Sequence, residues 1–282
     1  MSVDRHITTP AQVAALLDDP TFTVPPVPTG GPTLGIRWLR RSVARFSEGE
    51  HHQHRRRLAV TLLSTVDPTE LRHQAHHQTT TLLDTAAPDP IDLISQISRV
   101  IPVRVLATAL GAPTAPISAV ATAAQAYQPH TGDEEPANHA VAELAQAFNG
   151  GEDDTTAAKI ALLIQTYDAT AGLIGNAART MLRTDTPNTP TETIVTTTLR
   201  RQPPVRRTRR TAKDTGETIT LDLATSNLPF GAGRHQCPGR THALAITTGI
   251  LDALHGARLA EHHIDHEPST TPHIPTKILV TR

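Results

Sequence analysis

The sequence contains a single cysteine, Cys237, among 282 residues, and aromatic residues make up only 2% of it. One thiol excludes a disulfide within the chain and is typical of a reducing, cytosolic environment. No hydrophobic run approaches the length that spans a bilayer, and residues 1–20 lack the apolar core and cleavage site of a signal peptide. We therefore expect a cytoplasmic protein with a core of Leu, Ile, Val and Ala.

The chain also lacks an excess of charge of either sign. Lys and Arg total 26 against 27 Asp and Glu, which gives a net charge of −1. Arginines nevertheless concentrate in residues 37–57 and 200–213. A nucleic-acid surface would interleave them with aromatic side chains, and only Trp38 and Phe46 are present there. We expect no nucleic-acid or membrane partner, and solvated surface is the plainest interpretation of both runs.

Hydrophobic periodicity predicts a mainly α protein with small β parts. Apolar residues recur at helical spacing in three segments, 91–111 (with a break at Pro102), 155–181 and 244–254. Strand-like alternation is confined to 218–223 and 277–281. Loops are expected at 20–34, 129–137 and 184–191. No internal repeat or linker divides the chain, so we expect one domain over residues 1–282.

The cysteine lies in the stretch FGAGRHQCPG, residues 230–239, just before a helical segment. The glycines allow a sharp turn and a close approach of the backbone. Backbone N–H groups at the helix N-terminus would favour a thiolate at Cys237. A thiolate is a ligand for soft metals and one of the established axial ligands of haem iron.

Other interpretations of this stretch exist. A lone cysteine is often a small buried hydrophobic residue. Cys237 could also be a nucleophile with His235 as its base, although residues two apart in a loop seldom align for this. A dinucleotide fingerprint lacks its third glycine, and a phosphate-binding loop lacks Gly-Lys-Ser/Thr.

The stretch resembles the haem-ligand loop of the cytochrome P-450 superfamily, Phe-Gly-x-Gly-x-His-x-Cys-x-Gly, at every fixed position. The resemblance implies that haem b binds here and that Cys237 is the ligand of the iron. Phe230 would pack near the sulfur and His235 would reach a haem propionate. The fixed glycines of the cofactor loop are Gly231, Gly233 and Gly239.

Further segments resemble the same family in the same order. EHHQHRRRL resembles the C-helix, and its His52 and Arg56 would bind a propionate; four residues apart, they share one helix face. LLIQTYDATAGLIGNA, residues 162–177, resembles the I-helix. RQPPVRRTRRTA resembles the segment after the K-helix, in which Arg210 would bind the other propionate.

Several positions depart from the family pattern. Thr197 replaces the glutamate that pairs with the K-helix arginine, so Arg200 must be exposed or find another acceptor. In the I-helix, Asp168 keeps the acid position, but Ala169 replaces the threonine that handles oxygen. Thr170 comes one residue later, about 100° around the helix. The resemblance therefore assigns the catalytic positions to Asp168 and Thr170.

The chain is also short for this family. The resemblance predicts a truncated cytochrome P-450-like fold with a reduced N-terminal sheet region, an abbreviated mid-region and an abbreviated meander before the Cys237 loop. A pocket shortened in this way could be closed by a second copy, so a homo-oligomer is possible.

These features imply a haem-thiolate oxidoreductase that oxidises a small organic substrate, in secondary-metabolite (antibiotic) biosynthesis, with an acidic ferredoxin as a possible electron donor. One alternative is a haem enzyme that catalyses coupling, cyclisation or rearrangement rather than monooxygenation. The other is a degenerate partner or activator protein without turnover. Histidine clusters at 51–54, 73–77 and 261–266 could bind zinc or nickel, but solvated or propionate-facing histidines are the better interpretation.

Overall fold

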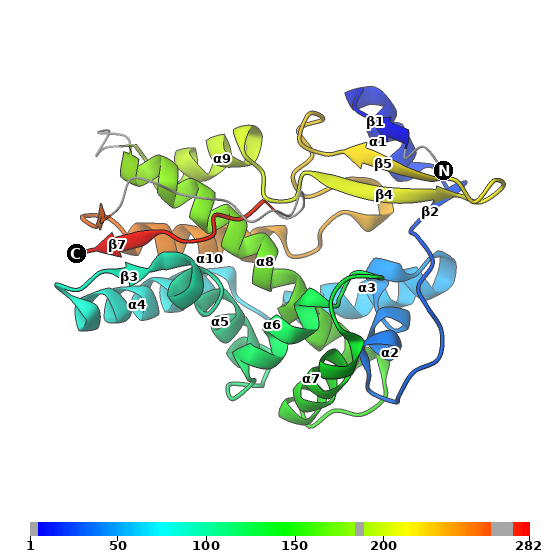
Figure 1. The fold of residues 1–282 in the computed structure, drawn as a ribbon, viewed down its shortest axis with the longest axis horizontal. Coiled ribbons are helices and arrows are strands. Elements are labelled where there is room, and N and C mark those ends of the chain that lie inside the picture. The colour runs from blue at the N-terminus through cyan, green and yellow to red at the C-terminus, as the bar shows by residue number, and fades with distance from the viewer. Residues whose placement is uncertain (1–4, 184–188, 261–272) are drawn as a thin grey trace.

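The computed structural model describes residues 5–183, 189–260 and 273–282. Helices dominate it, and two small sheets lie at its edges (Figure 1). The α-helices are α1 (Pro10–Asp18), α2 (Ile36–Arg41), α3 (Gly49–Ser64), α4 (Pro68–Ala86), α5 (Ile101–Ala109), α6 (Ile117–Gln125), α7 (Glu134–Ala147), α8 (Asp154–Arg183), α9 (Thr191–Arg201) and α10 (Arg240–Ala253). Three single-turn elements join them: η1 (Ala44–Phe46), the π-helical η2 (Leu93–Ser98) and η3 (Gly233–His235).

The larger sheet has four strands in the order β1-β5-β4-β2. Its strands are β1 (Arg5–Ile7), β2 (Phe22–Thr23), β4 (Arg207–Ala212) and β5 (Thr218–Asp222). β4 and β5 form an antiparallel hairpin, β1 pairs parallel to β5, and β2 pairs antiparallel to β4. The N-terminal strands span only three and two residues. This agrees with the predicted reduction of the N-terminal sheet region.

The smaller sheet holds the C-terminal segment. Its order is β3-β7-β6, with β3 (Ile91–Asp92), β6 (Arg258–Leu259) and β7 (Leu279–Thr281). The strand predicted at 277–281 is therefore confirmed in its last three residues.

The long helix α8 runs through the middle of the helical part, with α9 and the larger sheet on one side and α6 and α7 on the other (Figure 1). Its middle approaches other chain segments closely at glycines. A Cβ on Gly172 would lie 2.7 Å from Cβ of Pro204, and one on Gly175 would lie 2.7 Å from Cδ1 of Ile94. These close approaches fix the position of α8 against the segments that follow α9 and precede α5.

Two hydrophobic clusters form the core. The larger one joins the helices around α8, and the smaller one fills the space between α1 and the larger sheet. The smaller cluster contains Ile7, Val13, Leu17, Ile219, Leu221 and Leu223. Both consist mostly of aliphatic side chains, as the shortage of aromatic residues predicts.

Most of the predicted helices are confirmed, including the break in 91–111, where η2 ends at Ser98 and α5 begins at Ile101. The start of that segment is wrong, because residues 91–92 form strand β3, and the predicted loop 20–34 contains strand β2. The loop predicted at 129–137 is wrong in its last part because α7 begins at Glu134. Asp133 caps that helix by accepting a hydrogen bond from the N–H of Glu135 at 3.0 Å. Residues 184–188 of the predicted loop 184–191 lie outside the described residues. Arg200 is exposed, one of its two predicted outcomes.

Within the described ranges, no helix combines the length and the hydrophobicity that a membrane crossing requires.

Candidate functional site

The Cys237 loop is a tight backbone turn between β5 and α10. The N–H of Cys237 donates to the carbonyl of Phe230 at 2.9 Å, which closes the loop on itself. Gly231 and Gly233 have φ angles of 67° and 65°, in the left-handed region that favours glycine. A Cβ on Gly233 would also lie 3.0 Å from the carbonyl oxygen of Leu17. The loop therefore needs glycine at both positions.

Other members of the motif have different roles. The guanidinium of Arg240 lies over the ring of Phe230, 5.4 Å from its centroid. Gly239 is the N-cap residue of α10, with an ordinary φ of −92°. A Cβ there would meet Cδ1 of Leu63 at 3.8 Å, a normal contact, so the ligand-free backbone does not require glycine at this position.

Solvent reaches Cys237, but the protein atoms around it desolvate the thiol. This desolvation raises the pKa of Cys237, while a hydrogen bond from the N–H of Gly239 and the charges of Arg56 and Arg45 oppose the rise. The sequence predicted that the helix terminus would favour a thiolate. The N–H contribution is present, but desolvation outweighs it.

Four basic side chains converge beside the loop: His52, Arg56, Arg210 and His235. We call them the cationic cluster. The ring of His52 lies against that of His235, with centroids 4.1 Å apart, and Nη1 of Arg56 donates to the carbonyl of Gln236 at 2.7 Å. Arg210 is 2% exposed, because β4 alternates and turns this side chain inward. The charge of Arg210 acts on His235, so three elements distant in sequence bring basic side chains to one place.

The cationic cluster has unused hydrogen-bonding capacity. Nε2 of His52 and Nε of Arg210 are buried and have no hydrogen-bond partner in the part of the chain that the structure describes. Burial lowers the pKa of His52 to about 4, helped by the nearby His235, and lowers the pKa of Arg210 to about 10. Buried donors without acceptors destabilise a protein, so the cluster is suited to an anionic ligand.

Glu48 also belongs to this site, although no sequence pattern indicates it. Its carboxylate accepts hydrogen bonds from Nε of Arg234 at 3.1 Å, Nε2 of His235 at 3.2 Å and the N–H of Val24 at 2.8 Å. Partial burial acts to raise the pKa of Glu48, but these hydrogen bonds and charges prevail and lower it to about 2. Glu48 is therefore ionised and holds the ring of His235 in place.

Comparison with known proteins identifies the fold. No protein-family model and no curated protein matches the chain. Among solved structures, cytochrome P-450 BioI, in complex with an acyl carrier protein ligated to hexadec-9Z-enoic acid, is 18% identical with a TM-score of 0.79; the match covers 98% of this chain and 91% of BioI. The cytochrome P-450 PksS of the bacillaene polyketide synthase of Bacillus subtilis 168 is 16% identical with a TM-score of 0.78, covering 98% and 89%. CYP154A1 from Streptomyces coelicolor A3(2) is 21% identical with a TM-score of 0.76, covering 99% and 93%.

The chain has the cytochrome P-450 fold.

Within this cytochrome P-450 fold, α3 contains the segment that resembles the C-helix, α8 the one that resembles the I-helix, and α9 the one that resembles the K-helix. The two candidate catalytic residues lie in the middle of α8. Asp168 forms an ion pair with Arg99, whose Nη2 lies 3.1 Å from Oδ1, and Arg99 also stacks over the ring of Tyr167. Thr170 is 3% exposed. Asp168 is thus held by the η2–α5 junction rather than by the Cys237 loop.

The donor set of the site fits haem. A sulfur ligand suits iron, and two buried nitrogens without acceptors, next to two further cations, suit the two propionate carboxylates.

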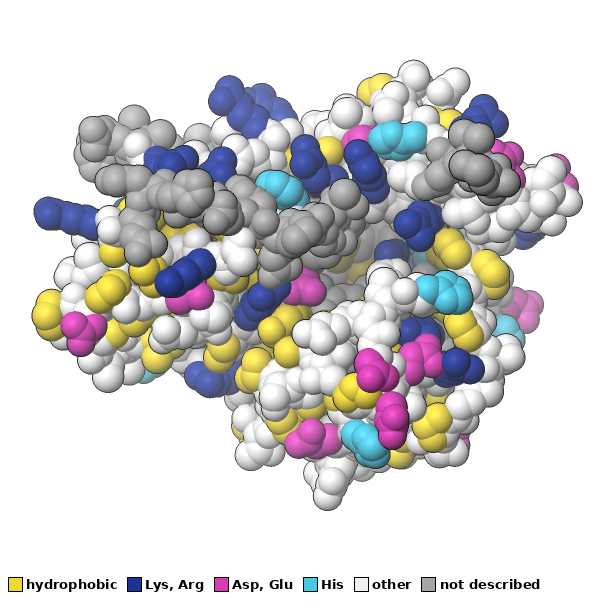
Figure 2. Space-filling view, viewed as in Figure 1, with side chains coloured by type: hydrophobic (Ala, Val, Ile, Leu, Met, Phe, Trp, Pro, Cys, Tyr) yellow, Lys and Arg dark blue, Asp and Glu magenta, His cyan; other side chains and the backbone are white. Residues whose placement is uncertain are grey.

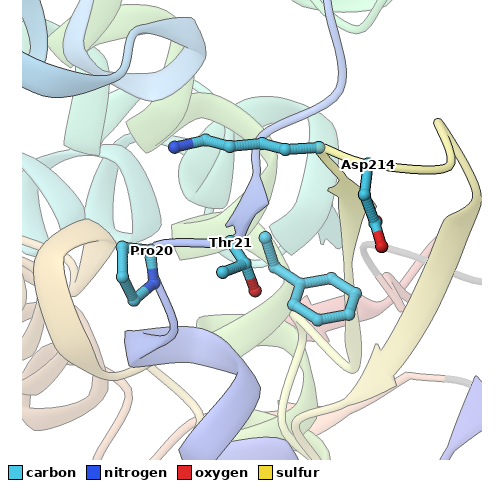
Figure 3. Close-up of a pocket in the computed structure, with 5 residues that line it drawn as sticks. Pro20, Thr21 and Asp214 are labelled. Carbon is cyan, nitrogen blue, oxygen red and sulfur yellow. The ribbon is translucent and has the colours of Figure 1, made fainter.

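A cavity of about 490 Å³ lies elsewhere, at the β2–β4 edge of the cytochrome P-450 fold (Figure 3). Pro20, Thr21, Phe22, Lys213 and Asp214 line it, and none of them is a sequence-predicted site residue.

The histidine clusters form no metal site among the residues that the structure describes, since no group of three or more His, Cys, Asp or Glu residues is placed to hold an ion. His73 and His77 are exposed on α4. The cluster at 261–266 lies outside the described residues.

Proposed function

We propose that this chain binds haem b through Cys237 and acts as a haem-thiolate oxidoreductase on a small organic substrate. The observation that carries the proposal is the convergence of the sole cysteine with four basic side chains, two of which have buried nitrogens without a partner among the described residues. The cytochrome P-450 fold supports it.

The residues have distinct tasks in this proposal. Cys237 provides the sulfur ligand, while Arg56 and Arg210 neutralise propionates together with His52 and His235. Glu48 orients His235 through its 3.2 Å hydrogen bond. Haem held by a thiolate supplies the activation of oxygen or peroxide, and the protein supplies the binding and orientation of the substrate.

Proton delivery falls to α8. Ala169 has no hydroxyl group, so Asp168 holds and passes the proton together with the hydroxyl of Thr170. Arg99 holds the Asp168 carboxylate in position through their ion pair at 3.1 Å.

We predict that Asp168→Asn lowers substrate-dependent turnover at least tenfold and leaves haem content unchanged, because general acid–base groups typically contribute 10²–10⁴-fold. Glu143→Gln, on the exposed side of α7, is the matched control. Turnover unchanged by Asp168→Asn would remove this residue from the mechanism.

Two alternative functions can be distinguished from this one by experiment. Ala169 favours a coupling, cyclisation or rearrangement in which substrate groups replace the missing hydroxyl; product formation without stoichiometric use of oxygen and reductant would support it. A partner protein without turnover would lack bound haem, and the retained motif around Cys237 disfavours it. Haem content and oxygen consumption, measured on one purified preparation, separate all three.

The biological setting that we propose is secondary metabolism. PksS, of the bacillaene polyketide synthase, shares the fold across almost the whole chain and supports this setting. A screen of polyketide and related natural-product intermediates for changes in the haem absorption spectrum tests it.

We further propose an acidic ferredoxin as electron donor. Arg206, Arg207 and Arg209 are exposed at the start of β4, and Figure 2 shows Lys and Arg side chains gathered on the face that includes α9 and β4. A positive surface accelerates association with an acidic partner in a salt-dependent way. Reduction rates should fall with added salt and with Arg206→Glu/Arg207→Glu; rates insensitive to both exclude docking there.

A further inference from the structure

One cation near Cys237 is not accounted for by the cationic cluster. Arg45 lies in η1, shortly before Glu48, whose carboxylate accepts a hydrogen bond from His235 of the site at 3.2 Å. The charge of Arg45 acts on both Cys237 and Arg210. Its guanidinium lies over the ring of Phe46, 5.8 Å from the centroid. Within the described ranges, no carboxylate lies within 4.0 Å of it and no hydrogen-bond acceptor is paired with it. In the part of the chain that the structure describes, Arg45 is therefore a positive charge without an anionic partner.

Neighbouring arginines differ in this respect. The fully buried Arg40 donates to Glu134 at 2.5 Å, and Arg37 donates to the same carboxylate at 2.6 Å. Burial lowers the pKa of Arg45, so its charge is destabilised where it stands, but an arginine stays protonated at neutral pH. Among the described residues, Glu134 thus neutralises Arg37 and Arg40, while Arg45 has no carboxylate partner.

Tyr127, directly after α6, has a second unused donor. Its side chain is buried, and its hydroxyl has no hydrogen-bond partner among the described residues. Its ring packs edge-on against Phe46 with centroids 5.2 Å apart. Nε of Arg40 donates to its backbone carbonyl at 3.2 Å, which holds the residue in position. Burial raises the pKa of Tyr127, so the hydroxyl keeps its proton.

Arg45, Phe46 and Tyr127 therefore form one stack, with a guanidinium and a hydroxyl that both lack an acceptor. The ring of Phe46 contacts both Arg45 and Tyr127, and the charge of Arg45 opposes the rise in the pKa of Tyr127. A guanidinium beside a hydroxyl is complementary to a carboxylate, which accepts hydrogen bonds from both. The buried hydroxyl of Tyr127, which has no partner among the described residues, destabilises the protein, and a carboxylate that accepts its hydrogen bond would remove that destabilisation.

We propose that Arg45 and Tyr127 bind the carboxylate of an acidic substrate and thereby select it over neutral molecules of the same shape. The proposal rests on the proposed haem-enzyme function, since it concerns the substrate of that site. A carboxylate could also come from a haem propionate. The four members of the cationic cluster already serve two propionates, which leaves Arg45 for the substrate.

The test uses the haem-loaded protein and two matched ligand pairs, decanoate with 1-decanol and 4-phenylbutanoate with 4-phenylbutanol. Binding is measured at pH 7 by calorimetry and by the change in the haem absorption spectrum. We expect at least one carboxylate to bind about tenfold or more tightly than its alcohol, as charge-assisted hydrogen bonds typically allow.

Three variants assign the preference. Arg45→Gln should abolish it by weakening the carboxylate and leaving the alcohol unchanged. Tyr127→Phe should weaken the carboxylate several-fold without lowering the melting temperature of the ligand-free protein, because the hydroxyl that it removes has no partner. Arg57→Gln, the same change at an exposed position of α3, should alter nothing.

The contradicting outcomes are distinct. Equal binding of acids and alcohols by the unaltered protein overturns the proposal. A preference for carboxylates that survives in Arg45→Gln also overturns it. Loss of haem from Arg45→Gln would mean that Arg45 binds a haem propionate rather than the substrate, and would overturn it as well. If the protein takes up no haem at all, the binding titration cannot be started, and this result refutes the proposed function itself.

Discussion

At the scale of single residues, the site is a set of basic side chains placed where they are poorly solvated. His52 and Arg210 are 4% and 2% exposed, and each lies close to further positive groups. Among the described residues, the acidic side chain that the structure shows hydrogen-bonded to the cationic cluster is Glu48, which accepts from His235. Such an arrangement is unfavourable for the ligand-free chain and favourable once anionic groups are bound.

His52 makes the stability of the folded chain depend on pH. Its pKa is about 4 in the folded chain, against an ordinary value of 6.5. As the pH falls below 6.5, the unfolded chain takes up the proton first, so the stability contributed by neutral His52 is present above pH 6.5 and is lost towards pH 4.

We predict that haem-free protein loses about 2–3 kcal/mol of unfolding free energy between pH 6.5 and 4 relative to the His52→Asn variant. Urea unfolding at several pH values in this window measures it. His51→Asn, at the exposed neighbouring position, should keep the pH profile of the unaltered chain. Identical profiles for His52→Asn and His51→Asn would show that His52 is not desolvated.

The sequence predicts some of these residues and not others, for a physical reason. The motif residues around Cys237, and the pair His52 and Arg56, are predicted through their resemblance to cytochrome P-450 segments, each of which is a short pattern within one loop or one helix. Glu48 and His235 are 187 positions apart, and the hydrogen bond between them depends on the tertiary fold. The same is true of Tyr127, whose unpaired hydroxyl becomes visible only once Phe46 and Arg40 are packed against it.

At the scale of helices and strands, periodicity predicts helices well and polar strands poorly. The long apolar face in 155–181 becomes α8, whose burial continues over several turns. β4 has the sequence RTRRTA, which shows no apolar alternation, yet it pairs along its length with the predicted strand β5. β4 is a strand because it pairs with β5, and this pairing turns Arg210 inward and Arg209 outward.

The contact between α10 and α4 depends on one small residue. A Cβ on Gly249 would overlap the backbone carbonyl oxygen of Arg72, which cannot move without displacing α4. Because α10 follows the Cys237 loop directly, this contact also fixes the end of that loop.

We predict that Gly249→Ala lowers the unfolding free energy by about 2–3 kcal/mol, in the range of overpacked cores. Gly151→Ala is the matched control, since a Cβ there meets nothing closer than 4.0 Å. Chemical denaturation measures both. Equal stability of the two variants would mean that α4 yields readily and does not hold α10 in place.

At the scale of the whole molecule, a short chain keeps the central elements of the cytochrome P-450 fold. The sequence predicts this through family-like segments in the right order, although no family model matches the chain. It could not predict β1 and β2, because strands of three and two residues carry no periodic signal. The cationic cluster and the Cys237 loop connect α3, β4 and α10, so a ligand bound there links parts that are distant in sequence.

Haem should therefore stabilise the folded chain, because a ligand that binds only the folded state raises its stability by mass action. At a free haem concentration 1,000 times the dissociation constant, the gain is about 4 kcal/mol, which corresponds to roughly 10 °C or more in melting temperature. Thermal unfolding with and without bound haem measures this shift. Equal melting temperatures would mean that haem does not hold these elements together.

The central claim is a bond between the Cys237 sulfur and haem iron. The carbon-monoxide difference spectrum of the reduced protein tests it most directly, because the position of the main absorption band reports the ligand opposite carbon monoxide. The account predicts the red-shifted band of thiolate-ligated haem in the unaltered protein and its loss in Cys237→Ser. A protein that stays colourless after reconstitution with hemin, or a red-shifted band that survives Cys237→Ser, would contradict it.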